Sequence, residues 1–91
     1  MTKTVLIVED NEKNMKLVRD ILQHKGHATI EAATGGDGVR LAVERRPDLV
    51  LMDVGLPDTD GREVVRSLRK GGFKAPIIML TGHDTDSDTI L

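Results

Sequence analysis

Three short, uninterrupted apolar runs constrain the fold of this 91-residue chain more than any other feature. They lie at Val5–Val8, Leu49–Met52 and Ile77–Leu80. A run of this length without polar alternation is typical of a strand that is buried on both faces of a parallel sheet. Ala28–Ala32 is less apolar and predicts a weaker strand at an edge of the sheet. We therefore expect four strands.

The segments between these strands carry apolar residues at helical spacing, and each ends at a helix-stopping residue. The three ends are marked by Gly26, by Pro47 and by the two glycines that follow Lys70. Asp60 and Glu63 predict a capping pair at the start of the third helix. The helical positions are Met15, Val18, Ile21 and Leu22, then Val39, Ala42 and Val43, then Val64, Val65 and Leu68. Alternation of strands and helices predicts an α/β fold, with a parallel sheet covered on both faces.

Composition narrows the classes of function. The length allows one domain, and a formal charge of −2 with scattered basic residues favours neither nucleic acid nor membrane as a partner. No apolar run reaches the length of a membrane span, and the N-terminus lacks a signal-peptide core. The absence of cysteine excludes disulfides and thiolate catalysis, and a cytoplasmic location is the default expectation.

Polar residues follow each of the three strong strands directly. Glu9 and Asp10 follow the first, Asp53 the second and Thr81 the third. Since ligands of parallel sheets bind outside the carboxyl ends of the strands, these groups should meet in one crevice. Single polar residues at strand ends are often turn formers or helix caps, and that alternative holds for each of them alone.

Together, these residue types fit phosphoryl transfer to a carboxylate. Neighbouring carboxylates repel one another, and Mg²⁺ offsets that repulsion through oxygen ligands. A carboxylate can also attack phosphorus, and a hydroxyl can donate to a phosphoryl oxygen.

Three segments of the chain resemble the signature segments of two-component receiver domains, in order and at the spacing of that family. They read VLIVEDN at 5–11, LMDVGLPDTDG at 51–61 and PIIMLT at 76–81. The resemblance implies a flavodoxin-like sheet with strand order 2-1-3-4-5. Residues 1–91 would form one receiver domain with strands in the order 2-1-3-4, without the fifth strand and last helix.

The resemblance also implies a role for each residue at the strand ends. Asp53 would accept a phosphoryl group from a sensor histidine kinase or phosphotransfer protein, and Thr81 would be the switch hydroxyl. Mg²⁺ would be held by Glu9, Asp10, Asp53 and the backbone carbonyl of Gly55. Such a chain is not an enzyme acting on an outside substrate, but a module that catalyses its own phosphorylation and dephosphorylation.

The pattern of the family is broken after Thr81. No Lys or Arg follows, so the lysine that lies beyond the fifth strand in the family is missing. Ile77–Leu80 would then be an apolar edge strand, which is a template for pairing with a second copy. Three interpretations follow from this: a homodimer through the exposed edge of the fourth strand, exchange of elements with a neighbouring copy, or a sequence that is part of a longer protein. The cognate kinase and the downstream target do not follow from the sequence.

Two alternatives remain at this point. The missing lysine favours a receiver-like fragment that is never phosphorylated and acts by docking or dimerisation. The second alternative is a phosphohydrolase of the haloacid dehalogenase type, which also uses an Asp nucleophile and Mg²⁺. Those enzymes need a second Asp two residues after the nucleophile, where this chain has Gly55.

Overall fold

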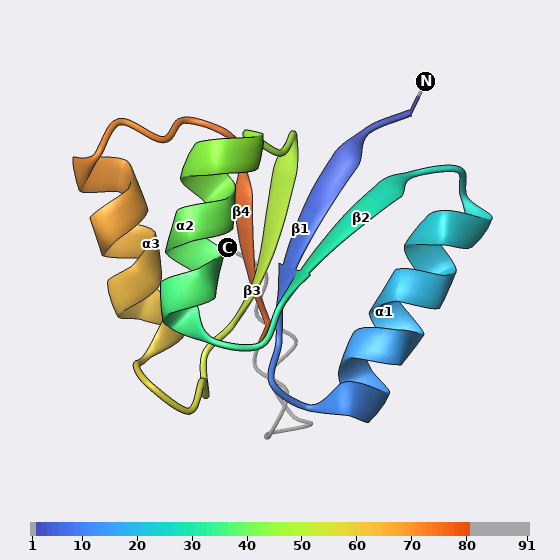
Figure 1. Cartoon of the computed structure of the whole chain (residues 1–91), viewed down its shortest axis with the longest axis horizontal. Coiled ribbons are helices and arrows are strands. Elements are labelled where there is room, and N and C mark those ends of the chain that lie inside the picture. Colours follow the sequence, from blue (N-terminus) through green and yellow to red (C-terminus); the bar gives the residue numbers. More distant parts are fainter. Residues whose placement is uncertain (1, 81–91) are drawn as a thin grey trace.

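The computed structural model describes residues 2–80 and shows a four-stranded parallel sheet with helices on both faces (Figure 1). This architecture confirms the predicted α/β class. In chain order the elements are β1 (Thr4–Val8), α1 (Glu12–His24), β2 (Ala28–Ala32), α2 (Gly35–Arg45), β3 (Leu49–Asp53), α3 (Gly61–Lys70) and β4 (Ile77–Leu80).

The strands lie in the order β2-β1-β3-β4, as the sequence predicts. β1 pairs with both β2 and β3, and β3 also pairs with β4, always in parallel. β2 is an edge strand, which agrees with its weaker apolar pattern. The two central strands are the ones whose carboxyl ends carry Glu9 and Asp53.

The continuous apolar run of β1 has a simple cause, because each face of the sheet is covered by helices. Leu6 and Val8 belong to the core beneath α2 and α3, while Val5 and Ile7 belong to the core beneath α1. Figure 1 shows α2 and α3 together on one side of the sheet and α1 on the other. Alternate side chains therefore enter two different cores, and all four positions from Val5 to Val8 are apolar and buried.

Two apolar residues that the helical pattern placed on buried faces are exposed instead. Ile21 in α1 is 49% exposed and Val43 in α2 is 63% exposed. Each lies beside a residue that does face the sheet, Leu22 and Ala42 respectively. Neighbours in a helix are about 100° apart, so one residue of each pair points away from the core.

The predicted capping pair of α3 is only half correct. Asp60 caps the helix, since its carboxylate accepts the N–H of Arg62 at 2.8 Å. Glu63 does not return to the backbone of Asp60; its carboxylate pairs with Arg66 on the next turn. A nearby guanidinium provides a better partner for this carboxylate than an amide does.

α2 lies very close to β1 at the end of the strand. A Cβ atom added to Gly38 would lie 2.9 Å from Cγ2 of Val8, so this contact requires glycine. Val8 directly precedes Glu9, and the contact fixes the end of the strand beneath the helix. Between residues 2 and 80, no helix has both the length and the apolar character needed to span a bilayer.

Candidate functional site

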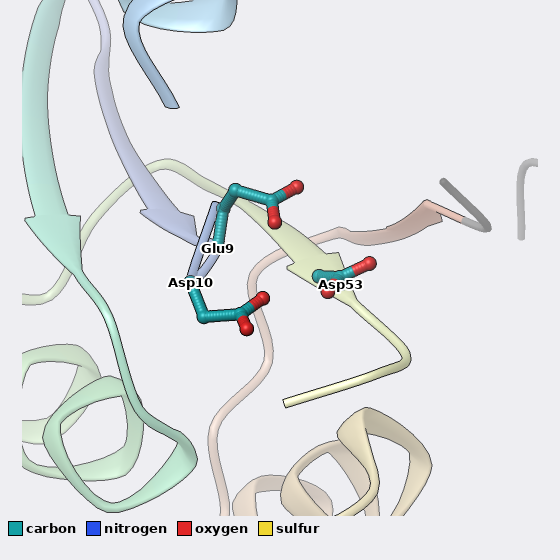
Figure 2. A group of neighbouring side chains, drawn as sticks. All are labelled: Glu9, Asp10 and Asp53. Atoms are coloured by element: carbon teal, nitrogen blue, oxygen red, sulfur yellow. The ribbon is translucent and has the colours of Figure 1, made fainter. Parts of the chain in front are cut away.

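The register of the sheet brings three carboxylates together. Val8 of β1 pairs with Met52 of β3, so the next residues, Glu9 and Asp53, lie side by side at the carboxyl edge. Figure 2 shows Glu9 and Asp10 at the end of β1 and Asp53 at the end of β3. One ligand oxygen from each of the three lies within 4.8 Å of the others.

Burial makes this cluster electrostatically costly. Glu9 is 5% exposed and Asp53 is 2% exposed, while Asp10 is open to solvent. Burial raises the pKa of Glu9 above its ordinary value, and the nearby charges of Asp53 and Asp10 raise it further. The N–H of Asn11 opposes this shift by donating to the Glu9 carboxylate. The folded chain therefore holds a proton on Glu9 more tightly than the unfolded chain does.

The donor set fits a hard divalent cation. Among residues 2–80, this is the one group of three acidic or histidine side chains that could reach a single metal ion. All three supply carboxylate oxygens, which are the ligands that Mg²⁺ prefers. A bound cation would offset the repulsion that raises the pKa of Glu9. A hollow of about 490 Å³ opens beside Glu9 and Asp10, between α1 and the end of β2.

Asn11 holds the β1 side of the site in place, and the sequence reasoning missed it. Its side-chain oxygen caps α1 by accepting the N–H of Lys13 at 2.9 Å and of Asn14 at 3.1 Å. Its own N–H donates to Oε2 of Glu9 at 3.1 Å. One residue thus starts the helix and orients a carboxylate. Asn immediately before a helix that begins with Glu is a recognisable cap pattern.

The loop after Asp53 is held against β3 by close backbone contacts. A Cβ atom added to Gly61 would lie 2.0 Å from the carbonyl oxygen of Asp53, so only glycine fits there. The N–H of Gly61 donates to the carbonyl of Val54 at 2.9 Å. Gly55 pairs with Asp60 in an isolated antiparallel bridge. The loop is therefore folded back on itself beside the carboxylates.

The structure brings together Glu9, Asp10 and Asp53, three of the predicted site residues. Gly55 lies two residues beyond Asp53 in the folded loop, and the metal-binding role of its carbonyl stays a prediction. Thr81 lies outside the described residues, so its switch role also stays a prediction.

Comparison with known proteins decides the family. The family model of the response regulator receiver domain matches residues 5–90. The chain belongs to the response regulator receiver family. It is 51% identical to the polar-differentiation response regulator DivK of Brucella ovis over 69 residues, which cover 76% of this chain and 56% of that protein. The match therefore spans little more than half of that relative.

A longer alignment and a solved structure agree with this assignment. DivK of Brucella anthropi is 51% identical over 90 residues, covering 97% of this chain and 73% of that protein. The receiver domain of sensor histidine kinase PA1611 from Pseudomonas aeruginosa superimposes with a TM-score of 0.86 at 33% identity, covering 97% of this chain and 74% of that one. That receiver domain holds a magnesium ion coordinated in its active site cleft.

The predicted resemblance and the flavodoxin-like fold are confirmed. Receiver domains as a class serve two-component signalling, bind Mg²⁺ at an acidic pocket and interact with histidine kinases or phosphotransfer proteins. This chain has the acidic cluster of such a pocket. Membership of the receiver family removes the basis for the haloacid dehalogenase alternative.

Proposed function

We propose that this chain accepts a phosphoryl group on Asp53 and that Mg²⁺ bound by Glu9, Asp10, Asp53 and the Gly55 carbonyl is required. The observation that carries the proposal is the sheet register, which sets a buried Glu9 beside a buried Asp53 with their oxygens within 4.8 Å of those of Asp10. The PA1611 receiver domain, with magnesium in its cleft, supports the metal assignment.

The reaction needs little from the protein beyond positioning. A carboxylate oxygen of Asp53 attacks the phosphorus of a phosphohistidine, a new O–P bond forms, and the N–P bond breaks with its electron pair returning to the imidazole. Mg²⁺, when bound, neutralises negative charge on the transferring group. Glu9 and Asp10 would hold the cation, and Gly61 keeps the Asp53 backbone in one position. The Thr81 hydroxyl would donate to a phosphoryl oxygen.

The same site would reverse the modification. Attack of water on the phosphorus of the aspartyl phosphate breaks the new O–P bond, releases inorganic phosphate and restores the Asp53 carboxylate. Gly55 has no side chain to cover the approach to Asp53. We expect Gly55→Asn to slow loss of the phosphoryl group, and an unchanged half-life of the phosphorylated protein would contradict this.

The test is the intact mass of the protein after incubation with acetyl phosphate, with and without Mg²⁺. We expect a gain of one phosphoryl group that depends on Mg²⁺ and is absent in Asp53→Asn. A folded wild-type protein that gains no mass would contradict the proposal. The docking alternative would then take its place, since it needs no chemistry at Asp53.

The phosphoryl donor would be a sensor histidine kinase or a phosphotransfer protein, as in the family. We also propose a homodimer through the edge of β4. This strand pairs with β3 along one edge, and within residues 2–80 no strand pairs with the other. Sedimentation over a range of concentrations tests this idea, and a monomer at every concentration would contradict it.

A further inference from the structure

Asp58 connects the loop beside the phosphoacceptor to a different part of the molecule. Its carboxylate accepts the N–H of Gly35 at 2.8 Å and of Gly36 at 3.0 Å, in the first turn of α2. These partners lie 23 and 22 residues away in the chain. A helix normally obtains its cap from the residue directly before it. Here one part of the cap comes from the β3–α3 loop.

α2 also has an ordinary cap, so Asp58 is an addition to it. The side-chain oxygen of Thr34 accepts the N–H of Asp37 at 3.1 Å. Asp58 satisfies the two amides that precede Asp37. The first N–H groups of a helix have no partner within the helix, and all three here are satisfied from outside the helix. Loss of Asp58 would leave the local cap intact and remove the long-range link alone.

The packing around Gly35 shows how closely the loop fits against the helix. A Cβ atom added to Gly35 would lie 2.4 Å from Cγ2 of Thr59 and 2.9 Å from Cγ2 of Val64. Any side chain at position 35 would push the loop outward. Gly36, the next residue, has no such constraint, because its added Cβ would lie 3.6 Å from the Asp58 carboxylate.

The other end of the link is the metal site. Asp58 lies between Gly55 and Asp60, the two residues that pair across the loop. Its position therefore affects where the Gly55 carbonyl lies beside Asp53. The two N–H donors from α2 lower the pKa of Asp58 below its ordinary value, so the carboxylate stays ionised at neutral pH and keeps both bonds.

We propose that Asp58 is a positioning residue for the phosphoacceptor site, because it anchors the loop that carries Gly55 to the first turn of α2. This inference rests on the proposed function. It also implies a signal in the reverse direction, since coupling between two sites is reciprocal. Binding of Mg²⁺ should slow the exchange of the backbone amide hydrogens in the first turn of α2 with solvent.

The experiment compares Asp58→Ala with Asp37→Ala. Asp37 is an exposed acid that lies within the first turn of α2 itself, where it pairs with Arg40. Its loss removes the same charge from the same helix end without touching the loop. We would titrate each variant with MgCl₂ and follow amide chemical shifts. We expect Mg²⁺ affinity to fall about tenfold in Asp58→Ala and to stay at the wild-type value in Asp37→Ala. Asp58→Asn keeps one acceptor oxygen and should give an intermediate value.

Amide hydrogen exchange without metal measures the anchor itself. We expect the N–H of Gly61, which bonds to Val54, to exchange faster in Asp58→Ala and at the wild-type rate in Asp37→Ala. We also expect Mg²⁺ to slow exchange at Gly36 in the wild type and to have no such effect in Asp58→Ala. The global unfolding transition of each variant, recorded by circular dichroism, separates these local changes from general destabilisation.

The outcomes distinguish this inference from the proposed function. Unchanged exchange at Gly61 in Asp58→Ala would overturn the inference, whatever the wild type does with acetyl phosphate. Faster exchange at Gly61 together with wild-type Mg²⁺ affinity in Asp58→Ala would also overturn it, because the contact of Asp58 with α2 would then have no effect on the metal site. A wild-type protein that neither binds Mg²⁺ nor gains a phosphoryl group would overturn the proposed function, and the inference with it.

Discussion

The two connections that flank the carboxylate cluster are built in opposite ways. The β1–α1 connection, Glu9–Asn11, is three residues long and its side-chain hydrogen bonds are local, while one backbone bond, from the N–H of Glu9 to the carbonyl of Ala32, joins it to the end of β2. The β3–α3 connection, Val54–Asp60, is longer and is held by α2, which lies far away in the sequence. The geometry of the first therefore depends mostly on residues close to it in the sequence, while that of the second depends on the packing of α2.

The largest expected effect comes from closing the tightest contact of the long connection. In Gly61→Ala the new Cβ would lie 2.0 Å from the Asp53 carbonyl oxygen, so the Asp53 backbone must move. We expect a loss of about 1–3 kcal/mol in the free energy of unfolding and no phosphoryl gain from acetyl phosphate. Gly71→Ala is the control, because its Cβ would lie at an ordinary 3.5 Å from the Ser67 carbonyl oxygen. Normal phosphorylation of Gly61→Ala would contradict the geometry.

The second-largest effect is expected from a substitution in α2 at its contact with the β3–α3 connection. Gly35→Ala should displace Thr59 and weaken Mg²⁺ binding, since its Cβ would lie 2.4 Å from that side chain. Gly36→Ala should keep Mg²⁺ affinity and gain up to ~1 kcal/mol in stability, because alanine favours a helix. Isothermal titration with MgCl₂ and urea unfolding measure both. Equal Mg²⁺ affinities in the two variants would show that the loop does not depend on its fit to α2.

A third test uses pH to examine the short connection. The pKa of Glu9 is raised in the folded protein, so its contribution to stability is greatest below its ordinary value of 4.5 and is lost as pH rises through the folded pKa. Without metal, the melting temperature of the wild type should therefore fall, relative to that of Glu9→Gln, as pH rises from 4.5 through the raised pKa of the folded protein. Saturating Mg²⁺ should remove this loss at neutral pH. A wild type that follows Glu9→Gln at every pH would show that burial imposes no cost on Glu9.

The smallest effect on the site is expected from Asn11→Ala. The variant loses the side-chain cap of α1 but keeps the backbone N–H that donates to Glu9. We expect a loss of about 1 kcal/mol in stability and unchanged Mg²⁺ affinity, whereas Asn11→Ser should restore the stability. A large loss of Mg²⁺ affinity would show that the short connection also depends on the packing of its helix.

The same difference explains how much of the site could be predicted from sequence. Glu9, Asp10 and Asp53 were identifiable because each directly follows an apolar run, and parallel strands end at one edge of a sheet. Asn11 was missed, although a local cap pattern marks it. Asp58 had no local signal, because its partners in α2 are more than 20 residues away. A pattern within a short window does not show such a pairing.

For the fold, too, local patterns were predictable from the sequence and long-range contacts were not. Strands and helix order were predictable because burial on both faces leaves continuous apolar runs, and the family resemblance supplied the strand order. The exposure of Ile21 and Val43 was not predictable from the sequence, since the width of the contact between a helix and the sheet depends on tertiary packing. Gly61 ends the second segment that resembles the family, but its close contact with the Asp53 carbonyl is visible only in three dimensions.

The strand order also has a consequence for biosynthesis. β1 is made first, yet it is an interior strand whose second neighbour, β3, is made some 40 residues later. A nascent chain that has formed only β1, α1 and β2 has Glu9 and Asp10 in place while Asp53 is still absent. The carboxylate cluster is thus completed only after β3 has been made. A chain released before β3 docks would present one bare edge of β1, a surface on which a chaperone or another nascent chain can act.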